Sequence, residues 1–288
     1  MRPSKDTTPT TSAGLFTIPQ ECSWHFDREL KPEDKSVAGN YALIPAETTD
    51  IVKVLEAYSH HPVAGYDIAS IEIVYNEQLN RLFFGNLSMM NLRHGNDRYQ
   101  PKWKKAGDSP EKQHRLKVDA QFRALAKSHT DPKAPHVSLL PLWHGTNDDI
   151  AQDYIFNMGY GIFMANDPNV VTDEGYFGKG IYSAHEAEYS FRSYAQKHGN
   201  KAVLILNWVS SFEAYPVIDG DMDKLRGKAL AFDQTDGHFI PVRSNQHILS
   251  TTRQRIRCRW SFPAVVLNGV LICYQKRRGV PLMLEQAF

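Results

Sequence analysis

Three segments between residues 142 and 194 decide the fold: Leu142-Trp-His-Gly-Thr146, Phe177-Gly-Lys-Gly-Ile-Tyr-Ser-Ala184 and Glu188-Tyr-Ser-Phe-Arg-Ser-Tyr194. The first predicts the end of a buried strand, followed by a helix from Asp148 to Met158 that Gly159 ends. The second predicts a glycine-rich bend leading into a strand, and the third predicts a helix that carries a serine and tyrosines. Each segment alone has an ordinary structural explanation, but together they indicate a functional site.

Short apolar strands are predicted around these segments in the second half of the chain. They span Leu139–Trp143, Ala202–Val209, Arg253–Trp260 and Val265–Tyr274. They do not alternate regularly with helices, so the pattern favours an α+β fold with mostly antiparallel pairing.

The first half of the chain predicts fewer elements. A short strand is expected near residues 41–44, a helix over 51–58, a strand over Tyr66–Tyr75 and a helix over 119–127. Asn76 is expected to cap a further helix. The buried face of that helix is predicted to consist of Leu79, Leu82, Phe83 and Leu87.

Composition places the chain among ordinary globular proteins. It has 288 residues, 42% of them hydrophobic, and a net charge of +1, so no overall field attracts nucleic acid or membranes. Cys22, Cys258 and Cys273 form no CxxC pair, which favours a reducing compartment. No apolar run approaches the roughly 20 residues that a membrane span needs. We expect a disordered arm over residues 1–20 and a single domain over 21–288.

Two basic segments leave alternatives open. Residues 94–117 are polar and basic, and predict either a solvated loop with a helix start or a surface for phosphates or a partner. Arg253, Arg255, Arg257 and Arg259 alternate with other residues, which places them on one face of a strand. That face is either solvent-facing or binds phosphates or an acidic partner.

Several catalytic patterns are absent from the sequence. It has no GxSxG elbow, no GxxxxGK[ST] phosphate loop and no HExxH pair. Glu186-Ala-Glu188 is superficially similar to the ExE carboxylate pair of arginine-directed toxins. The pair falls in a predicted helix, where solvent-facing glutamates are the commoner explanation.

The three deciding segments resemble the catalytic domain of the poly(ADP-ribose) polymerase family, whose members carry His-Gly-[Ser/Thr] at a strand end and then Phe-Gly-x-Gly-Ile-Tyr-Phe-Ala. Residues 177–184 differ from that block only at Ser183, where the family has Phe. Ala187-Glu-Tyr-Ser190 is similar to the Ala-x-Tyr-Ser of mono-ADP-ribosylating members. Residues 66–79 look like the opening strand and helix of that domain, so the resemblance spans about residues 65–284.

The resemblance implies an ADP-ribosyltransferase fold, with a split, mostly antiparallel β-core, flanking helices and a cleft for NAD⁺ as substrate, without a metal. The Gly145 N–H and C=O would bind the nicotinamide carboxamide, with the Ser190 hydroxyl as a further donor, between the rings of Tyr182 and a second tyrosine. His144 would bind a ribose hydroxyl, and residues 161–174 would line the diphosphate and adenosine. The implied NAD⁺-binding residues are His144, Gly145, Thr146, Tyr182, Ala184, Ser190 and Tyr194, with Thr146 near the adenosine.

The second tyrosine requires a choice. In the family it lies three residues after the serine, which is Ser193 in this chain. We expect Tyr194 to take its place through a one-residue insertion, with Tyr189 as the alternative.

One departure from the family bears on the reaction. Polymerising members place a glutamate at the start of the last core strand, within Asn-Glu-Tyr-Ile-Val-Tyr. The corresponding strand looks like Leu267–Tyr274, and aligning the later Val280–Leu284 with the closing segment of the family puts the glutamate position at about Val270, with Gly269 or Leu271 as the next candidates. No glutamate lies between Glu213 and Glu285. The catalytic positions implied are therefore His144, Tyr182 and Val270, the last without its carboxylate. Because that carboxylate polarises the 2'-hydroxyl of an incoming ADP-ribose, its loss predicts transfer of single units.

The resemblance thus implies a mono-ADP-ribosyltransferase that releases nicotinamide and modifies an unidentified protein or nucleic-acid acceptor. The alternative is a catalytically weak or inactive module that binds NAD⁺, ADP-ribose or an acidic partner. We expect a cytoplasmic or nuclear protein with no membrane partner, delivery into another cell remaining open. No DNA-sensing module of the zinc-finger kind is identified in the sequence.

Overall fold

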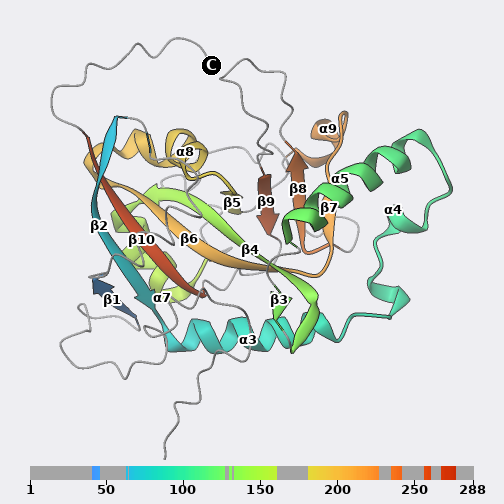
Figure 1. Ribbon diagram of the computed structural model, residues 1–288, viewed down its shortest axis with the longest axis horizontal. Coiled ribbons are helices and arrows are strands. Elements are labelled where there is room, and N and C mark those ends of the chain that lie inside the picture. The colour runs from blue at the N-terminus through green and yellow to red at the C-terminus, as the bar shows by residue number, and fades with distance from the viewer. Residues whose placement is uncertain are drawn as a thin grey trace, which may run out of the picture.

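The computed structural model describes residues 41–45, 63, 65–126, 130–131, 133–160, 181–226, 235–241, 256–260 and 267–276. Within these ranges the chain is α+β, with helices flanking a mostly antiparallel sheet (Figure 1). The predicted arm (1–20), the predicted helix over 51–58 and the segment 161–180 lie outside the described residues.

Ten strands form the sheet in the described part of the chain. In spatial order they are β1 (Ala42–Pro45), β2 (Tyr66–Tyr75), β10 (Leu267–Lys276), β6 (Ala202–Ser211), β4 (Ala134–Asn147), β5 (Ile181–Ala184), β9 (Ile256–Trp260), β8 (Gly237–Pro241) and β7 (Ala214–Pro216), with β3 (Thr130–Asp131) beside β4. The described strand pairs are antiparallel except β7 with β8.

The sheet is weakly joined in its middle. β4 pairs with β6 over its whole second half, from Ser138 opposite Ser211 to Asn147 opposite Ala202. By contrast, β4 and β5 are joined at the single position where Trp143 lies opposite Ala184. The sheet therefore consists of two parts, β1-β2-β10-β6-β4 and β5-β9-β8-β7, which meet between β4 and β5.

Helix α3 (Glu77–Asn91) starts as predicted, because the Asn76 side chain accepts a hydrogen bond of 3.0 Å from the Leu79 N–H. Leu79, Phe83 and Leu87 are buried against β4 and β6. The prediction for Leu82 was wrong: it is 60% exposed, because it lies about 100° around the helix from Phe83, outside the buried stripe.

Helix α5 (Pro110–Ala126) begins nine residues before the predicted start at 119. The Ser109 hydroxyl accepts a hydrogen bond of 3.1 Å from the Lys112 N–H, and Pro110 takes the first helical position, where its missing N–H costs nothing. Ahead of it lie the short helices η3 (Asp97–Tyr99) and α4 (Lys102–Lys105). Trp103 and Arg115 are buried, so residues 94–117 are not the wholly solvated stretch that their charge suggested.

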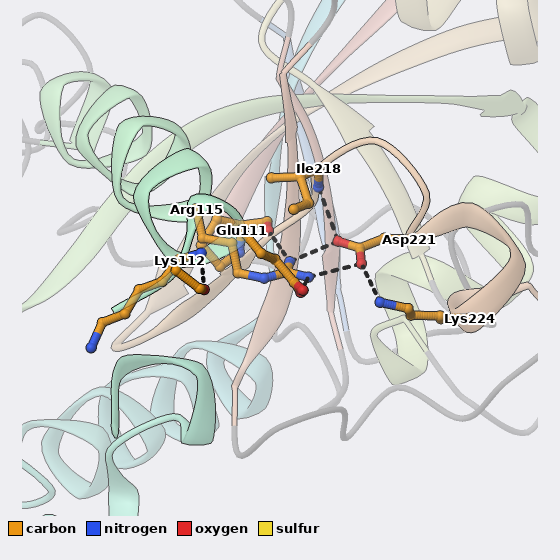
Figure 2. Close-up of polar contacts among 8 residues, drawn as sticks. Glu111, Lys112, Arg115, Ile218, Asp221 and Lys224 are labelled. Atoms are coloured by element: carbon orange, nitrogen blue, oxygen red, sulfur yellow. Dashed lines mark hydrogen bonds and ion pairs between the residues drawn. The ribbon is translucent and has the colours of Figure 1, made fainter. Parts of the chain in front are cut away.

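A buried ion pair fastens α5 to the turn before α9 (Met222–Leu225), as Figure 2 shows. The two Arg115 nitrogens donate to the two Asp221 carboxylate oxygens at 2.7 and 2.8 Å. Arg115 also donates to the Pro216 carbonyl (2.8 Å) and to Glu111 (2.7 Å), and it stacks over the Tyr215 ring. Burial alone would lower the pKa of Arg115, but its hydrogen bonds to Asp221 and Glu111 raise it, so the side chain stays charged.

The segment predicted as a helix over 148–158 is helical throughout, with a wide turn at its centre. It consists of α6 (Asp148–Ile150), the π-helical η4 (Ala151–Ile155) and α7 (Phe156–Met158), which Gly159 ends at a φ of 77°. Its apolar side, with Tyr160, packs on Val203 and Ile205 of β6. No helix in the described ranges is long and apolar enough to cross a membrane.

Candidate functional site

Two tyrosines predicted to face each other do so. Tyr182 comes from β5, and Tyr194 from η6 (Phe191–Ala195), which continues α8 (Ala187–Ser190) and precedes η7 (Gln196–Lys201). Their rings are within 23° of parallel, with centroids 6.4 Å apart. A flat ring between them would need about 3.5 Å on each side. The observed centroid distance is therefore slightly shorter than the roughly 7 Å between two rings that enclose a third.

The helix geometry is compatible with the one-residue insertion that we expect before Tyr194. Phe191–Ala195 is π-helical, and its Gln196 N–H bonds to the Phe191 carbonyl five residues back. An α-helix closes the same turn four residues back, so a π-turn accommodates one extra residue. The structure thus supplies the room that an inserted residue before Tyr194 requires.

Gly145 allows this helix to lie against β4. A Cβ atom at position 145 would lie 2.3 Å from the Ser190 carbonyl oxygen and 3.2 Å from the Ala195 nitrogen. Real Cβ atoms essentially never approach another atom as closely as 2.3 Å, so only glycine fits without moving the helix. The requirement comes from this close approach rather than from an unusual backbone angle.

Ser190 is buried in the same contact, with a hydroxyl that already has a partner. Its Oγ donates a hydrogen bond of 2.8 Å to the Trp143 carbonyl. Its single hydrogen is therefore used within the protein, so in this structure Ser190 is not the further donor that the resemblance implies. The lone pairs of Oγ remain the part of the group that can bind a ligand N–H.

His144 is half-buried beside the tyrosine pair. Its Nδ1 lies 2.8 Å from the Tyr182 carbonyl oxygen, which can only accept, so Nδ1 carries the hydrogen. Burial lowers the pKa of His144, and the hydrogen bond to Tyr182 opposes this only in part. The neutral ring therefore presents Nε2 as a hydrogen-bond acceptor.

The sequence did not point to Tyr160, which contacts His144, or to Asn207, which bonds to Tyr160. The Tyr160 ring packs edge-to-face on the His144 ring, at a centroid distance of 5.0 Å. The Tyr160 hydroxyl accepts a hydrogen bond of 2.7 Å from the Asn207 side chain. Asn207 is the one polar residue in the apolar run 202–209, and this break in the pattern was the sequence signal that could have drawn attention to it.

Thr146 and Ala184 are both buried close to this site. Thr146 lies opposite Val203 on β6, and Ala184 lies opposite Trp143 on β4.

Glu188 of the toxin-like pair accepts a hydrogen bond of 2.9 Å from Arg192 of the same helical segment. Both side chains are substantially exposed, as the ordinary structural explanation predicts. No group of three or more metal-ligating side chains occurs among the residues that the structure describes.

The structure does not place Val270 beside the tyrosine pair. On β10, Val270 lies opposite Leu206 of β6 and Ile73 of β2, so β6 separates it from β4. The strand bonded to β5 is β9, with Arg259 opposite Tyr182 and Arg257 opposite Ala184. β9 is an interior strand between β5 and β8, whereas Arg253 and Arg255 lie outside the described residues. The structure therefore brings together His144, Gly145, Tyr182, Ser190 and Tyr194, and adds Tyr160 and Asn207.

Comparison with known proteins gives no independent assignment. No protein-family model matches the chain, and no curated protein matches it significantly.

Proposed function

We propose that this chain is a mono-ADP-ribosyltransferase that cleaves NAD⁺, releases nicotinamide and transfers ADP-ribose to a macromolecular acceptor. The observation that carries the proposal is the near-parallel pair Tyr182 and Tyr194, with centroids 6.4 Å apart, beside the contact of Gly145 with Ser190. A planar cationic ring is the ligand that two facing phenol rings suit best.

The proposed chemistry breaks the bond between the ribose C1' and the pyridine nitrogen. The bonding electron pair goes to that nitrogen, which neutralises its charge and leaves oxocarbenium character on the ribose. A lone pair of the acceptor then forms the new bond to C1', and the acceptor group loses a proton. The protein contributes orientation and exclusion of water, which are large terms when the leaving group is already in place.

Each described residue has a role that fits its geometry. Tyr182 and Tyr194 hold the nicotinamide ring, and the main chain of Gly145 with Ser190 Oγ binds its carboxamide. Since the Ser190 hydrogen goes to Trp143, Oγ accepts from the carboxamide N–H in this scheme. His144 Nε2 accepts a hydrogen bond from a ribose hydroxyl, in keeping with its neutral Nδ1–H form.

A second candidate function is binding of NAD⁺ or ADP-ribose without cleavage. It is favoured by the lack of any glutamate between Glu213 and Glu285, because no glutamate from that segment can assist the reaction. In this case the same slot would hold the dinucleotide intact, and no nicotinamide would appear.

Nicotinamide release from NAD⁺ in the presence of a cell extract as acceptor source tests the proposal. We expect release, and protein bands that each carry single ADP-ribose units when the NAD⁺ is labelled. High-molecular-weight ladders would contradict transfer of single units. NAD⁺ binding by calorimetry with no nicotinamide release would favour the binding module, and absence of both binding and release would refute the proposed site.

A further inference from the structure

The imidazole of His144 is held by contacts on two sides. On one side Nδ1 donates to the Tyr182 carbonyl at 2.8 Å. On the other, the Tyr160 ring meets the His144 ring at an interplanar angle of 77° and a centroid distance of 5.0 Å. Such an edge-to-face contact is a favoured geometry for aromatic pairs, and it restricts rotation of the imidazole about its own side chain.

Tyr160 is itself fixed. Asn207 Nδ2 donates to the Tyr160 hydroxyl at 2.7 Å and to the Ile205 carbonyl at 3.2 Å, so one amide ties the phenol to the backbone of β6. Tyr160 and Asn207 are 5% and 2% exposed, and water does not compete for this hydrogen bond. Ile205 lies opposite His144 in the sheet, so the tie is anchored at the same level as the histidine.

We infer that Tyr160 and Asn207 are positioning residues that hold the His144 ring so that Nε2 faces the ribose hydroxyl of the dinucleotide. The inference rests on the proposed function and adds two residues to its machinery. Neither residue needs to touch the substrate: Asn207 orients the phenol, the phenol confines the imidazole, and the imidazole accepts the hydrogen bond.

The surroundings of His144 suit this role. The titratable residues in direct contact with His144 in the described chain are Tyr160 and Tyr182, and burial raises the pKa of Tyr160 so that it stays neutral. The helical segment packed on β4 also carries Tyr189, Tyr194, and Glu188 and Arg192, the last two paired with each other. No charged side chain contributes to the lowered pKa of His144, whose cause is burial. The Tyr160 ring supplies part of that burial, so its removal is expected to admit water and raise the pKa of His144.

Three variants separate the steps of the argument. Tyr160→Phe keeps the ring and removes the tie to Asn207, Asn207→Leu removes the tie from the other end, and Tyr160→Leu removes the ring. Tyr154→Phe, at a half-buried tyrosine of η4 outside these contacts, is the matched control. Each full-length protein is characterised by NAD⁺ cleavage from pH 5 to 8 and by ¹⁵N spectra of its histidines.

We expect kcat to fall by roughly tenfold to a hundredfold in Tyr160→Leu with little change in KM, as for loss of orientation. Tyr160→Phe and Asn207→Leu should show smaller losses of similar size to each other, and Tyr154→Phe none. The ¹⁵N spectra should show His144 in its Nδ1–H form in the parent, with a pKa that rises in Tyr160→Leu and nearly recovers in Tyr160→Phe.

The inference is overturned if the pKa and ring form of His144 are the same in parent and Tyr160→Leu proteins, or if Tyr160→Leu raises KM with kcat unchanged. The spectra do not depend on turnover. If the parent protein cleaves no NAD⁺ but the pKa of His144 still rises in Tyr160→Leu, the proposed function is wrong and the positioning of His144 by Tyr160 is confirmed.

Discussion

His144 Nδ1 and the main-chain oxygen of Tyr182 lie 2.8 Å apart, and their hydrogen bond crosses the weakly joined boundary between β4 and β5. The same two residues carry an acceptor nitrogen and an aromatic face. The hydrogen bond therefore fixes the distance between His144 Nε2 and the Tyr182 ring. It does so across a boundary where β4 and β5, in the described part of the chain, are otherwise joined only by the pair Trp143 and Ala184.

Tyr194→Ala should reduce NAD⁺ cleavage by at least tenfold, because loss of one face of a stacked pair removes about 1 kcal/mol beyond buried area and also admits water. Tyr182→Ala should have a similar effect. Both are measured as initial rates of nicotinamide release, with circular dichroism to verify folding.

Tyr189→Ala is the control for this pair, since Tyr189 is half-buried on the same helical segment. We expect it to retain most of the parent rate. A large loss in Tyr189→Ala with a normal rate in Tyr194→Ala would show that the insertion is assigned to the wrong residue.

Gly145→Ala should displace the helix over β4, since its Cβ would lie 2.3 Å from the Ser190 carbonyl oxygen. We expect a loss of about 1–3 kcal/mol in the free energy of unfolding, together with loss of nicotinamide release. Gly85→Ala is the counterpart: Gly85 lies within α3, and a Cβ there meets nothing within 4 Å. That change should be neutral or stabilise by up to about 1 kcal/mol. Equal urea midpoints for the two variants would contradict the close contact.

The stability of the protein should fall at acid pH partly through His144. Because burial lowers the folded-state pKa of His144 below its unfolded value, the unfolded chain binds more protons as pH falls below about 6.5. Its contribution is therefore complete above about pH 6.5 and is lost as pH falls through the folded-state pKa. Urea denaturation from pH 5 to 8 should show a shallower decline for His144→Gln than for the parent, and parallel curves would rule this out.

Arg115→Met should cost about 3–5 kcal/mol in the free energy of unfolding, because the buried Asp221 carboxylate then keeps only the Ile218 N–H and the more distant Lys224 ammonium as partners. Arg115 and Asp221 side chains are only 3% and 1% exposed. The double variant Arg115→Met, Asp221→Leu should recover part of the loss, although the Ile218 N–H then also loses its acceptor. Arg192→Gln, which breaks an exposed pair with Glu188, should cost less than about 1 kcal/mol. Similar losses at Arg115 and Arg192 would show that burial does not govern the Arg115 pair.

The elements that the sequence predicted well are those whose signal is local. The alternation in residues 66–75 and the capping role of Asn76 depend on neighbours within a few positions, and β2 and α3 follow both. Leu82 was misplaced because two adjacent apolar residues can each be read as part of the same apolar stripe. In the structure Phe83 packs against β4 and β6, and Leu82 does not.

The parts of the site that motifs did not predict depend on contacts between distant segments. Tyr160 and Asn207 meet across 47 positions, and Arg115 meets Asp221 across 106, so neither pair leaves a pattern in any short window. The stacking of Tyr194 on Tyr182 was predicted only by supposing an insertion, which the π-turn accommodates. The assignment of Val270 to the missing glutamate remains a prediction from alignment, and β9 rather than β10 is the strand beside Tyr182.

The close approach at Gly145 also affects how the site decays in evolution. A lineage that no longer needs a ligand still needs its helix to dock on β4, so packing alone retains the glycine. His144 is under no such backbone constraint, because its bond across the β4–β5 boundary is made by its side chain. Among relatives without the proposed activity, the histidine should drift first, and a glycine at position 145 would mark the packing of the helix on β4 rather than that activity.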